Sequence, residues 1–189
     1  MNSSNYIKFL FIGFFVILSN AFYIVTEMEQ VVTTQFGKPV GDAKIKAGLY
    51  FKIPFIHTIL RFDKRLLEWD GAANEIPTKD NKYIFIDTFA RWKISNPLQF
   101  YKSAKNEMLA QSRLDDIIDG AVRDEVSNRF MSEIIRSSTR VMEVYDTEVA
   151  SDGNQQEILK DGARQEIILS ILGNVQAKLE ELNLGIAVI

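Results

Sequence analysis

Residues 82–95 read KYIFIDTFARWKIS, and this run is the most regular pattern in the chain. A period of two held over twelve residues predicts a β-strand whose alternate side chains lie on opposite faces. We expect one face to consist of Ile84, Ile86, Thr88, Ala90, Trp92 and Ile94. The other face, which becomes more polar toward its end, would carry Tyr83, Phe85, Asp87, Phe89, Arg91 and Lys93. The Asn96-Pro97 pair should end the strand, because proline cannot continue a central strand.

Shorter strands separated by turns are expected on the N-terminal side, between residues 26 and 70. The run QVVTTQF (30–36) is rich in β-forming residues, and the Gly37-Lys38-Pro39 that follows it is typical of a turn. In the later run LYFKIPF (49–55), alternate apolar residues share one face. Pro54 should end that strand or place it at a sheet edge.

Two amphipathic helices and a last strand are expected on the C-terminal side. The first helix should begin at Ser112 and the second at Asn154, each with an acidic residue three positions on, as in a capping box. The apolar stripe of the first is Leu114, Ile117, Ile118, Ala121, Val122, Val126, Phe130 and Ile134, and that of the second is Ile158, Ile167, Ile168, Ile171, Leu172, Val175, Leu179 and Leu182. Residues 137–154 predict a polar loop. Residues 185–189 predict a buried strand that stops midway, which favours a fragment or a natural truncation.

These segments predict an α+β fold, with short strands first and a helix–helix–strand arrangement after them. Residues 1–25 would form a separate N-terminal segment, and residues 26–189 one folded domain, which suits a chain of 189 residues. No repeat with a period of 20–50 residues interrupts this order.

The N-terminal segment is the most apolar part of the chain. Counted from Tyr6 to Val25 it has 20 residues, so as a helix it would span the roughly 30 Å of a bilayer core at about 1.5 Å per residue. We predict a transmembrane anchor, marked by Tyr6, Lys8, Phe9, Phe15, Tyr23 and Val25. The alternative is a signal peptide cleaved near Ser19-Asn20-Ala21. Because Lys8 precedes the segment while Glu27 and Glu29 follow it, the positive-inside bias places the N-terminus in the cytoplasm.

Composition excludes many kinds of chemistry. The chain has 22 Lys and Arg against 25 Asp and Glu, a net charge of −3, which argues against a nucleic-acid partner. It has no Cys, so thiolate nucleophiles, Cys-ligated zinc, Fe–S clusters and disulfides are all excluded. A single His excludes HExxH, a three-His zinc site and a facial triad.

The remaining motifs nominate no catalytic, cofactor-binding or metal-binding residue. The ten glycines form no G-x-G pair, and a P-loop and a nucleophile elbow are also missing. His57 lies in the apolar run FIHTIL (55–60), where a strand-edge His with a satisfied hydrogen bond is the expected role. Asp115/Asp116 and Glu180/Glu181 are adjacent on helices, so each pair diverges by about 100° and is expected to be solvated surface. We therefore predict that the chain is not an enzyme and needs no cofactor.

The run GLYFKIPFIHTIL (48–60) is unusual because Lys52 is its one charged residue. Thirteen residues are too few to span a bilayer. Two interpretations stay open: an ordinary buried strand pair, or a loop that dips into the interfacial leaflet while Lys52 reaches the headgroups. The residues of the possible dipping segment are Gly48, Leu49, Tyr50, Phe51, Pro54 and Phe55.

Several runs together resemble the SPFH superfamily of stomatins, prohibitins, flotillins and HflK/HflC proteins. The runs VVTTQFGKP (31–39) and AGLYFKIPFI (47–56) resemble the opening of that domain. TKDNK (78–82) and RWKISNP (91–97) look most like the HflC branch. The positions that carry the resemblance include Phe36, Gly37, Lys38, Asp87, Arg91, Trp92 and Pro97.

The resemblance implies a bacterial inner-membrane protein with one N-terminal anchor and a periplasmic domain whose early segment lies against the outer leaflet. HflC-like proteins assemble with HflK in large membrane cages that enclose and regulate the ATP-dependent protease FtsH. The family's long coiled-coil helix does not follow here, since the sequence ends at Ile189. A membrane-bound serine peptidase and a stomatin-like modulator of a channel or transporter stay open as alternatives.

Overall fold

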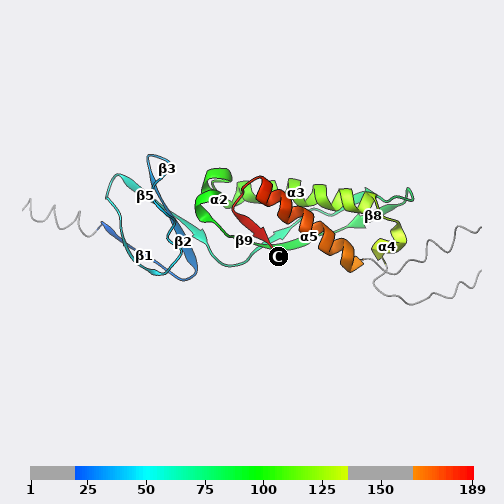
Figure 1. The fold of residues 1–189 in the computed structure, drawn as a ribbon, viewed down its shortest axis with the longest axis horizontal. Helices are drawn as coiled ribbons and strands as arrows, with labels where there is room; N and C mark the ends of the chain where they lie inside the picture. Colours follow the sequence, from blue (N-terminus) through cyan, green and yellow to red (C-terminus); the bar gives the residue numbers. More distant parts are fainter. Residues whose placement is uncertain (1–19, 136–163) are drawn as a thin grey trace, which may run out of the picture. The chain divides into compact units, whose positions relative to one another are not determined.

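The computed structural model describes residues 20–135 and 164–189. These residues form two compact units. Unit 1 holds the described residues up to Leu66, together with 93–105 and 184–186. Unit 2 holds 67–92 and 187–189, together with the described residues between 106 and 183. The elements are coloured along the chain in Figure 1.

Unit 1 is built mainly from five short strands. They are β1 (Phe22–Val25), β2 (Glu29–Gln35), β3 (Lys38–Pro39), β4 (Gly48–Phe51) and β5 (His57–Asp63). β1 pairs with β4 in an antiparallel two-stranded sheet, and β2 lies between β3 and β5 in a second sheet. The predicted run of short strands and turns is confirmed in this unit.

The core of unit 1 lies between these two sheets and the short helix α2 (Pro97–Ser103). Tyr23, Val25 and Val31 are buried together. Gln30 is buried too, and its side-chain amide donates to the Ile94 carbonyl at 3.1 Å, so the burial of this polar group is compensated. The ring of Phe100 on α2 meets Phe62 edge-on, with 5.2 Å between ring centroids.

The expected end of the membrane anchor is wrong by several residues. Tyr23 and Val25, which were expected in a transmembrane helix, lie in strand β1 with buried side chains. The residues FYIV suit a strand as well as they suit a lipid-facing helix, and pairing with β4 decides between the two. The other expected anchor positions, Tyr6, Lys8, Phe9 and Phe15, lie outside the described residues.

Unit 2 begins with a long hairpin. β6 (Leu67–Asp70) pairs with β9 (Phe89–Ile94), and β7 (Asn74–Pro77) pairs with β8 (Tyr83–Ile86). β10 (Ile186–Val188) lies on the other edge of β9 and confirms the predicted last strand. Residues 82–95 therefore form two strands rather than the single strand predicted, because the ladder is interrupted at Asp87 and Thr88. The predicted division of faces is confirmed, since Trp92 and Ile94 are buried while Tyr83, Phe85 and Phe89 are exposed.

Two long helices pack against each other in unit 2. They are α3 (Glu107–Ser127) and α5 (Arg164–Glu181), and Figure 1 shows them running side by side. The Ser170 hydroxyl on α5 donates to the Glu125 carboxylate on α3 at 3.2 Å. α3 also packs against β7, and the short α4 (Met131–Ile135) packs against α5.

The predicted helix boundaries and stripes are correct only in part. α3 begins at Glu107 instead of after Ser112, because the Asn106 side chain caps it by accepting from the Leu109 N–H at 2.8 Å. The expected start at Asn154 and the loop before it lie outside the described residues. Leu114, Ile118, Val122 and Val126 are buried as predicted on α3, whereas Ile168 on α5 and Leu182 just after it are exposed.

Candidate functional site

The outer face of the β1–β4 sheet is an exposed apolar surface. Along β1 the burial alternates, so Tyr23 and Val25 face the core while Phe22 and Ile24 face outward. Leu49 and Phe51 do the same on β4, and each of these four side chains is between 49% and 65% exposed. Phe22 and Phe51 are cross-strand partners whose rings meet edge-on, with 5.7 Å between centroids.

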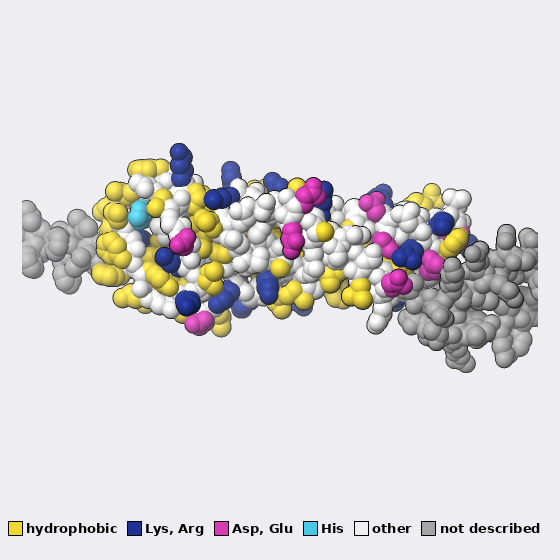
Figure 2. All heavy atoms as spheres, viewed as in Figure 1, with side chains coloured by type: hydrophobic (Ala, Val, Ile, Leu, Met, Phe, Trp, Pro, Cys, Tyr) yellow, Lys and Arg dark blue, Asp and Glu magenta, His cyan; other side chains and the backbone are white. Residues whose placement is uncertain are grey.

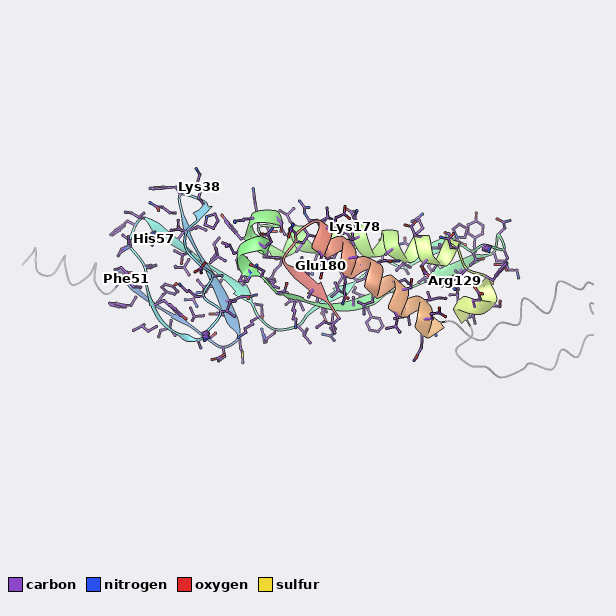
Figure 3. The ribbon with its side chains drawn as sticks, in the orientation of Figure 1. Lys38, Phe51, His57, Arg129, Lys178 and Glu180 are labelled. Carbon is purple, nitrogen blue, oxygen red and sulfur yellow. The ribbon has the colours of Figure 1, made fainter. Side chains whose placement is uncertain are left out.

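The loop that follows β4 continues this surface. Ile53, Phe55 and Ile56 are exposed, and Phe55 is 93% exposed with a left-handed backbone at φ +66°. We call the seven side chains of the sheet face and the loop the apolar end of unit 1: Phe22, Ile24, Leu49, Phe51, Ile53, Phe55 and Ile56. Figure 2 shows hydrophobic side chains gathered over this part of unit 1, and Figure 3 shows Phe51 pointing outward from its strand. A contiguous apolar surface of this kind marks a site for lipid or protein contact.

His57 holds the loop closed. Its backbone N–H donates to the Ile53 carbonyl at 3.0 Å, and its ring Nδ1 accepts from the Ile53 N–H at 3.3 Å. The Lys52 N–H also donates to the Ala21 carbonyl at 2.7 Å, which ties the loop to the residue before β1. His57 is thus hydrogen-bonded at the start of β5, as predicted, and the absence of a catalytic role for it stays a prediction.

The predicted dipping segment falls partly inside the fold. Leu49, Phe51 and Phe55 are exposed, and Gly48 is exposed at the start of β4. Tyr50 faces inward, where its ring stacks on Tyr23 with 5.8 Å between centroids. An ordinary buried strand pair therefore describes only one face of the segment, and entry of the open face and the loop into a leaflet stays a prediction.

The positions behind the family resemblance are mostly structural. Phe36 and Gly37 form the tight turn between β2 and β3, and the Tyr101 hydroxyl donates to the Gly37 carbonyl at 3.0 Å. Pro97 occupies the first turn of α2 after the Asn96 cap. The indole N–H of the buried Trp92 donates to the Glu68 carbonyl at 3.3 Å. Arg91 lies 3.9 Å from the Glu68 carboxylate on the exposed face, Asp87 lies at the break between β8 and β9, and Lys38 is exposed.

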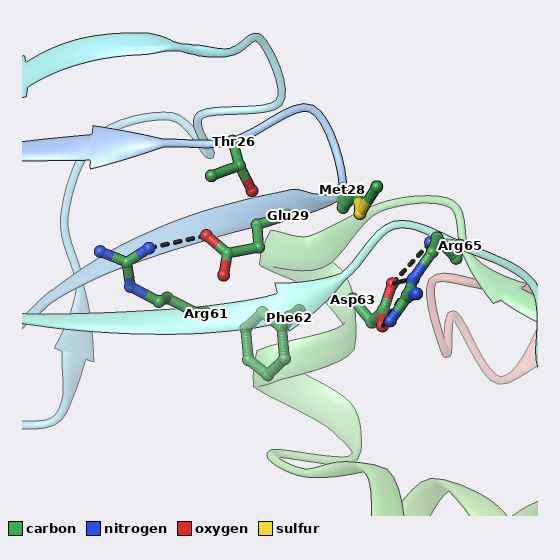
Figure 4. Close-up of a pocket in the computed structure, with 7 residues that line it drawn as sticks. All are labelled: Thr26, Met28, Glu29, Arg61, Phe62, Asp63 and Arg65. Atoms are coloured by element: carbon green, nitrogen blue, oxygen red, sulfur yellow. Dashed lines mark hydrogen bonds and ion pairs between the residues drawn. The ribbon is translucent and has the colours of Figure 1, made fainter.

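A shallow pocket of about 290 Å³ lies where Glu29 of β2 pairs with Asp63 of β5, at the end of these strands away from His57 (Figure 4). Arg61 pairs with Glu29 at 2.6 Å, and Arg65 pairs with Asp63 at 2.8 Å. The hydrogen bonds from Arg65 hold the pKa of the Asp63 carboxyl below its usual range. The four charges neutralise one another in two exposed pairs, so the pocket offers neither a nucleophile nor an unpaired charge for a ligand.

One polar contact was missed by the sequence analysis. Asp115 is exposed on the helix surface, as expected, but its carboxylate also accepts a 2.6 Å hydrogen bond from the indole N–H of the buried Trp69. The two residues are 46 positions apart, so no local pattern relates them. Asp119, one turn further along α3, has a raised pKa because burial and the carboxylates of Asp115 and Asp116 outweigh Arg123.

Among residues 20–135 and 164–189, no three His, Cys, Asp or Glu side chains gather in a way that could hold a metal ion. In the same ranges no helix combines the length and the apolar character that crossing a membrane requires. The functional surface that stands out in the described part of the chain is therefore the apolar end of unit 1.

Residues 23–189 match the SPFH domain / Band 7 family, and the chain belongs to that family. The resemblance inferred from the residue runs and the α+β fold class are both confirmed. The match begins within β1 and covers both units.

Curated relatives place the chain close to HflC proteins. Protein HflC of Treponema pallidum is 36% identical over 128 residues, which are 68% of this chain and 38% of that protein. Protein HflC of Borreliella burgdorferi is 42% identical over 118 residues, or 61% and 36% of the two chains. Modulator of FtsH protease HflC of Escherichia coli K12 is 31% identical over 126 residues, or 64% and 36%. Each match thus spans less than half of the relative's length.

The name of the Escherichia coli relative describes a modulator of the FtsH protease. This agrees with the prediction that the chain is not an enzyme, which the composition and motifs had indicated.

Proposed function

We propose that this chain is a subunit of an HflC-type scaffold, which assembles with an HflK-like partner and modulates an FtsH-like membrane protease in membrane-protein quality control. In this proposal residues near the N-terminus anchor it in the bacterial inner membrane, the N-terminus is cytoplasmic and the domain is periplasmic. The observation that carries the proposal is the apolar end of unit 1 in a chain of the SPFH family. Two of its side chains, Phe22 and Ile24, lie on β1, into which the apolar N-terminal segment runs.

The length of that segment supports a membrane contact by unit 1. Because Asn20 and Ala21 form a turn before β1, 14 residues from Tyr6 to Ser19 are left for a helical anchor. At about 1.5 Å per residue they would span about 21 Å, less than the roughly 30 Å of a hydrocarbon core. The apolar end of unit 1 would make up the difference by entering the outer leaflet, which reduces the hydrophobic mismatch.

A scaffold also needs a surface for neighbouring subunits, and unit 2 offers a candidate. Tyr83, Phe85 and Phe89 are each at least 65% exposed on the outer face of β8 and β9. Glu75 lies opposite Phe85, and Asp70 lies opposite Phe89, so acidic side chains border the aromatic ones. Exposed aromatic residues bordered by charge are typical of protein–protein contacts.

The ion pair at the end of α3 is less suited than these aromatic residues to setting the register between subunits. Glu125 on α3 and Arg129 just after it form an i,i+4 ion pair at 3.0 Å within the chain. Glu125 also accepts from Ser170, so its carboxylate is already engaged inside unit 2.

Co-purification from membranes tests the proposal. The tagged full chain is expressed in its own host, the membranes are solubilised in mild detergent, and the recovered proteins are identified. We expect HflK-like and FtsH-like proteins in a large complex. A chain that stays monomeric with its HflK-like partner present would contradict the scaffold.

The same preparation separates the alternatives. Recovery of a channel or transporter without the protease would favour a stomatin-like modulator. Labelling by an active-site serine probe that is lost in a single Ser→Ala variant would favour a peptidase. A Phe85→Asp variant is the surface test: it should weaken assembly, whereas Ser112→Asp on an exposed position of α3 should not.

A further inference from the structure

We propose that unit 1 meets the membrane at a second point, the Phe36-Gly37-Lys38 turn, and that this turn and the 52–56 loop together bind anionic phospholipid headgroups. The inference rests on the proposed membrane contact and names the chemistry of its lipid partner. Three observations carry it: the strand register, the backbone conformation of two exposed phenylalanines, and the distribution of charge.

The register places the turn and the loop at the same end of unit 1. Gln35 and His57 are direct partners in the β2–β5 ladder. Phe36 is the next residue after Gln35, and the 52–56 loop runs into His57, so both segments leave the sheet on the same side. The Lys52 N–H bond to the Ala21 carbonyl fixes this end beside the last residues of the apolar N-terminal segment.

Both segments present a phenylalanine in a backbone conformation that such residues rarely adopt. Phe36 has φ +48° and is 85% exposed, and Phe55 has φ +66° and is 93% exposed. A left-handed backbone is disfavoured for a bulky L-residue, and an exposed ring gains nothing from it in water. Both rings would be stabilised by burial in the interfacial region of a bilayer, where an aromatic side chain is favoured. Strain at an exposed aromatic tip therefore points to a surface that covers it.

Charge is divided between the two ends of the β2–β5 pair. From Gln30 to Phe62 the sequence contains a single acidic residue, Asp42. The end with the turn and the loop carries the cations of Lys38 and Lys52, and Lys38 extends outward from its hairpin in Figure 3. The acidic residues Glu27, Glu29 and Asp63 lie at the opposite end, where each is paired with Lys64, Arg61 or Arg65. Because these pairs neutralise one another, an anionic lipid surface would attract the first end and exert little net force on the second, which sets the orientation of unit 1.

The absence of Cys allows a direct test in the full chain. Phe36→Cys and Phe55→Cys variants are each labelled with an environment-sensitive fluorophore and reconstituted into vesicles that contain nitroxide-labelled lipid. The vesicles are made of phosphatidylcholine, with or without phosphatidylglycerol, and quenching reports contact of the label with lipid. Near-UV circular dichroism checks that each variant is folded.

We expect the label at position 55 to be quenched in both kinds of vesicle. The label at position 36 should be quenched mainly in the anionic vesicles, and about 1 M salt should abolish the difference because the Debye length then falls to about 3 Å. Adding Lys38→Gln and Lys52→Gln should reduce the ratio of quenched to unquenched label at position 36 by about fivefold or more. Lys44→Gln with Lys46→Gln is the matched control, since Lys44 bridges to Val31 and Ile45 contacts Lys64 near the opposite end.

The outcomes separate the two proposals. An unquenched label at position 55 would overturn the proposed membrane contact itself. Quenching at 55 with an equal response at 36 in neutral and anionic vesicles would overturn the headgroup inference alone. If Lys44→Gln with Lys46→Gln reduced quenching at position 36 as much as Lys38→Gln with Lys52→Gln did, the headgroup inference would also be overturned. The quenching would then depend on the net charge of unit 1 and not on the position of its cations.

Discussion

The outer face of β1–β4 in unit 1 and the outer face of β8–β9 in unit 2 have the same construction but different chemistry. β1 and β4 pair with each other, whereas β8 pairs with β7 and β9 pairs with β6. In both places the strands have a less exposed side and carry exposed aromatic residues on the other. In unit 1 the outward side chains, such as Ile24 and Phe51, are all apolar. In unit 2 the exposed Phe85 and Phe89 alternate with charged neighbours such as Arg91.

This difference indicates two kinds of partner. An uninterrupted apolar face suits a lipid interior, which cannot solvate a charge. A face that mixes aromatic rings with ions of both signs suits another protein, where each charge can find a counterpart. Burial alternation alone makes both faces look alike, and the charged positions between the rings distinguish them.

The largest effect is expected from reversing the polarity of a buried position in unit 2. Trp92→Asp places an unpaired charge where the native ring is fully buried, so we expect a loss of about 3–5 kcal/mol in the free energy of unfolding. Phe89→Asp, on the outer face of the same strand, is the control and should change stability by only about 0.5 kcal/mol. Urea unfolding measures both, and equal effects would show that the assigned faces of β9 are wrong.

The next largest effect is expected from a substitution in unit 1, at a glycine with a positive φ. A Cβ at Gly185 would lie 2.5 Å from the Asn96 carbonyl oxygen, and its φ of +68° disfavours any side chain. We expect Gly185→Ala to reduce the free energy of unfolding by about 2–4 kcal/mol.

Gly37→Ala separates strain from clash, because Gly37 also has a positive φ but nothing within 4 Å of the added Cβ. Its loss should be only about 1–2 kcal/mol. Thermal denaturation of the two variants side by side would contradict this account if Gly37→Ala were the more damaging.

Acid should weaken unit 2 through Asp80. The Thr78 hydroxyl, which donates to its carboxylate at 2.7 Å, lowers the pKa of Asp80 to about 2, helped by Lys82 and the Met131 N–H. The folded state therefore binds this proton less readily than the unfolded state does, so the stabilisation is complete above about pH 4 and is lost as the pH falls toward 2.

Asp80→Asn should lower the urea midpoint at neutral pH and flatten its fall between pH 4 and 2. Asp119→Asn is the opposite case: the pKa of Asp119 is raised, so its charge disfavours the folded state and removing it should raise the midpoint at neutral pH. If the acid transition were unchanged in the Asp80→Asn protein, the contacts of the Asp80 carboxylate would be excluded as the cause of the stability lost at low pH.

The smallest effect on stability is expected from the two outer faces themselves. Phe51→Asp and Phe85→Asp both alter exposed rings, so each should change the free energy of unfolding by about 0.5 kcal/mol or less. Their functional effects should differ: Phe51→Asp should reduce lipid quenching at position 55, and Phe85→Asp should reduce assembly with partners. If each variant impaired both properties equally, the distinction between the two faces would fail.

Local sequence patterns predicted which face of a strand or helix is buried better than they predicted the residues at which the element begins and ends. Alternation identified Trp92 as buried, and helical spacing identified Leu114 and Val122, because one-sided burial leaves a direct imprint on residue order. Tyr23 and Val25 were assigned to an anchor because apolar residues suit a membrane helix and a buried strand equally, and only the pairing with β4 decides between them.

Long-range contacts had no such imprint. The Trp69–Asp115 hydrogen bond joins residues 46 positions apart, and the polar character of Asp115 gave no hint of it. Ile168 fits an apolar stripe, yet α5 leaves it exposed, since the stripe of a helix records what is apolar and not what covers it. The candidate site was foreseen only as the 48–60 segment, and Phe36 joined it through the β2–β5 register.

The way the chain enters unit 1 has a mechanical consequence. The segment before Phe22 continues directly into β1, and β1 is held by four residue pairs to β4, from Phe22–Phe51 to Val25–Gly48. A pull along β1 would load these pairs together in shear instead of opening them one after another like a zipper. A tether attached in this way resists extraction by tension, so the joint would fail at a higher force than an equal number of bonds peeled from one end.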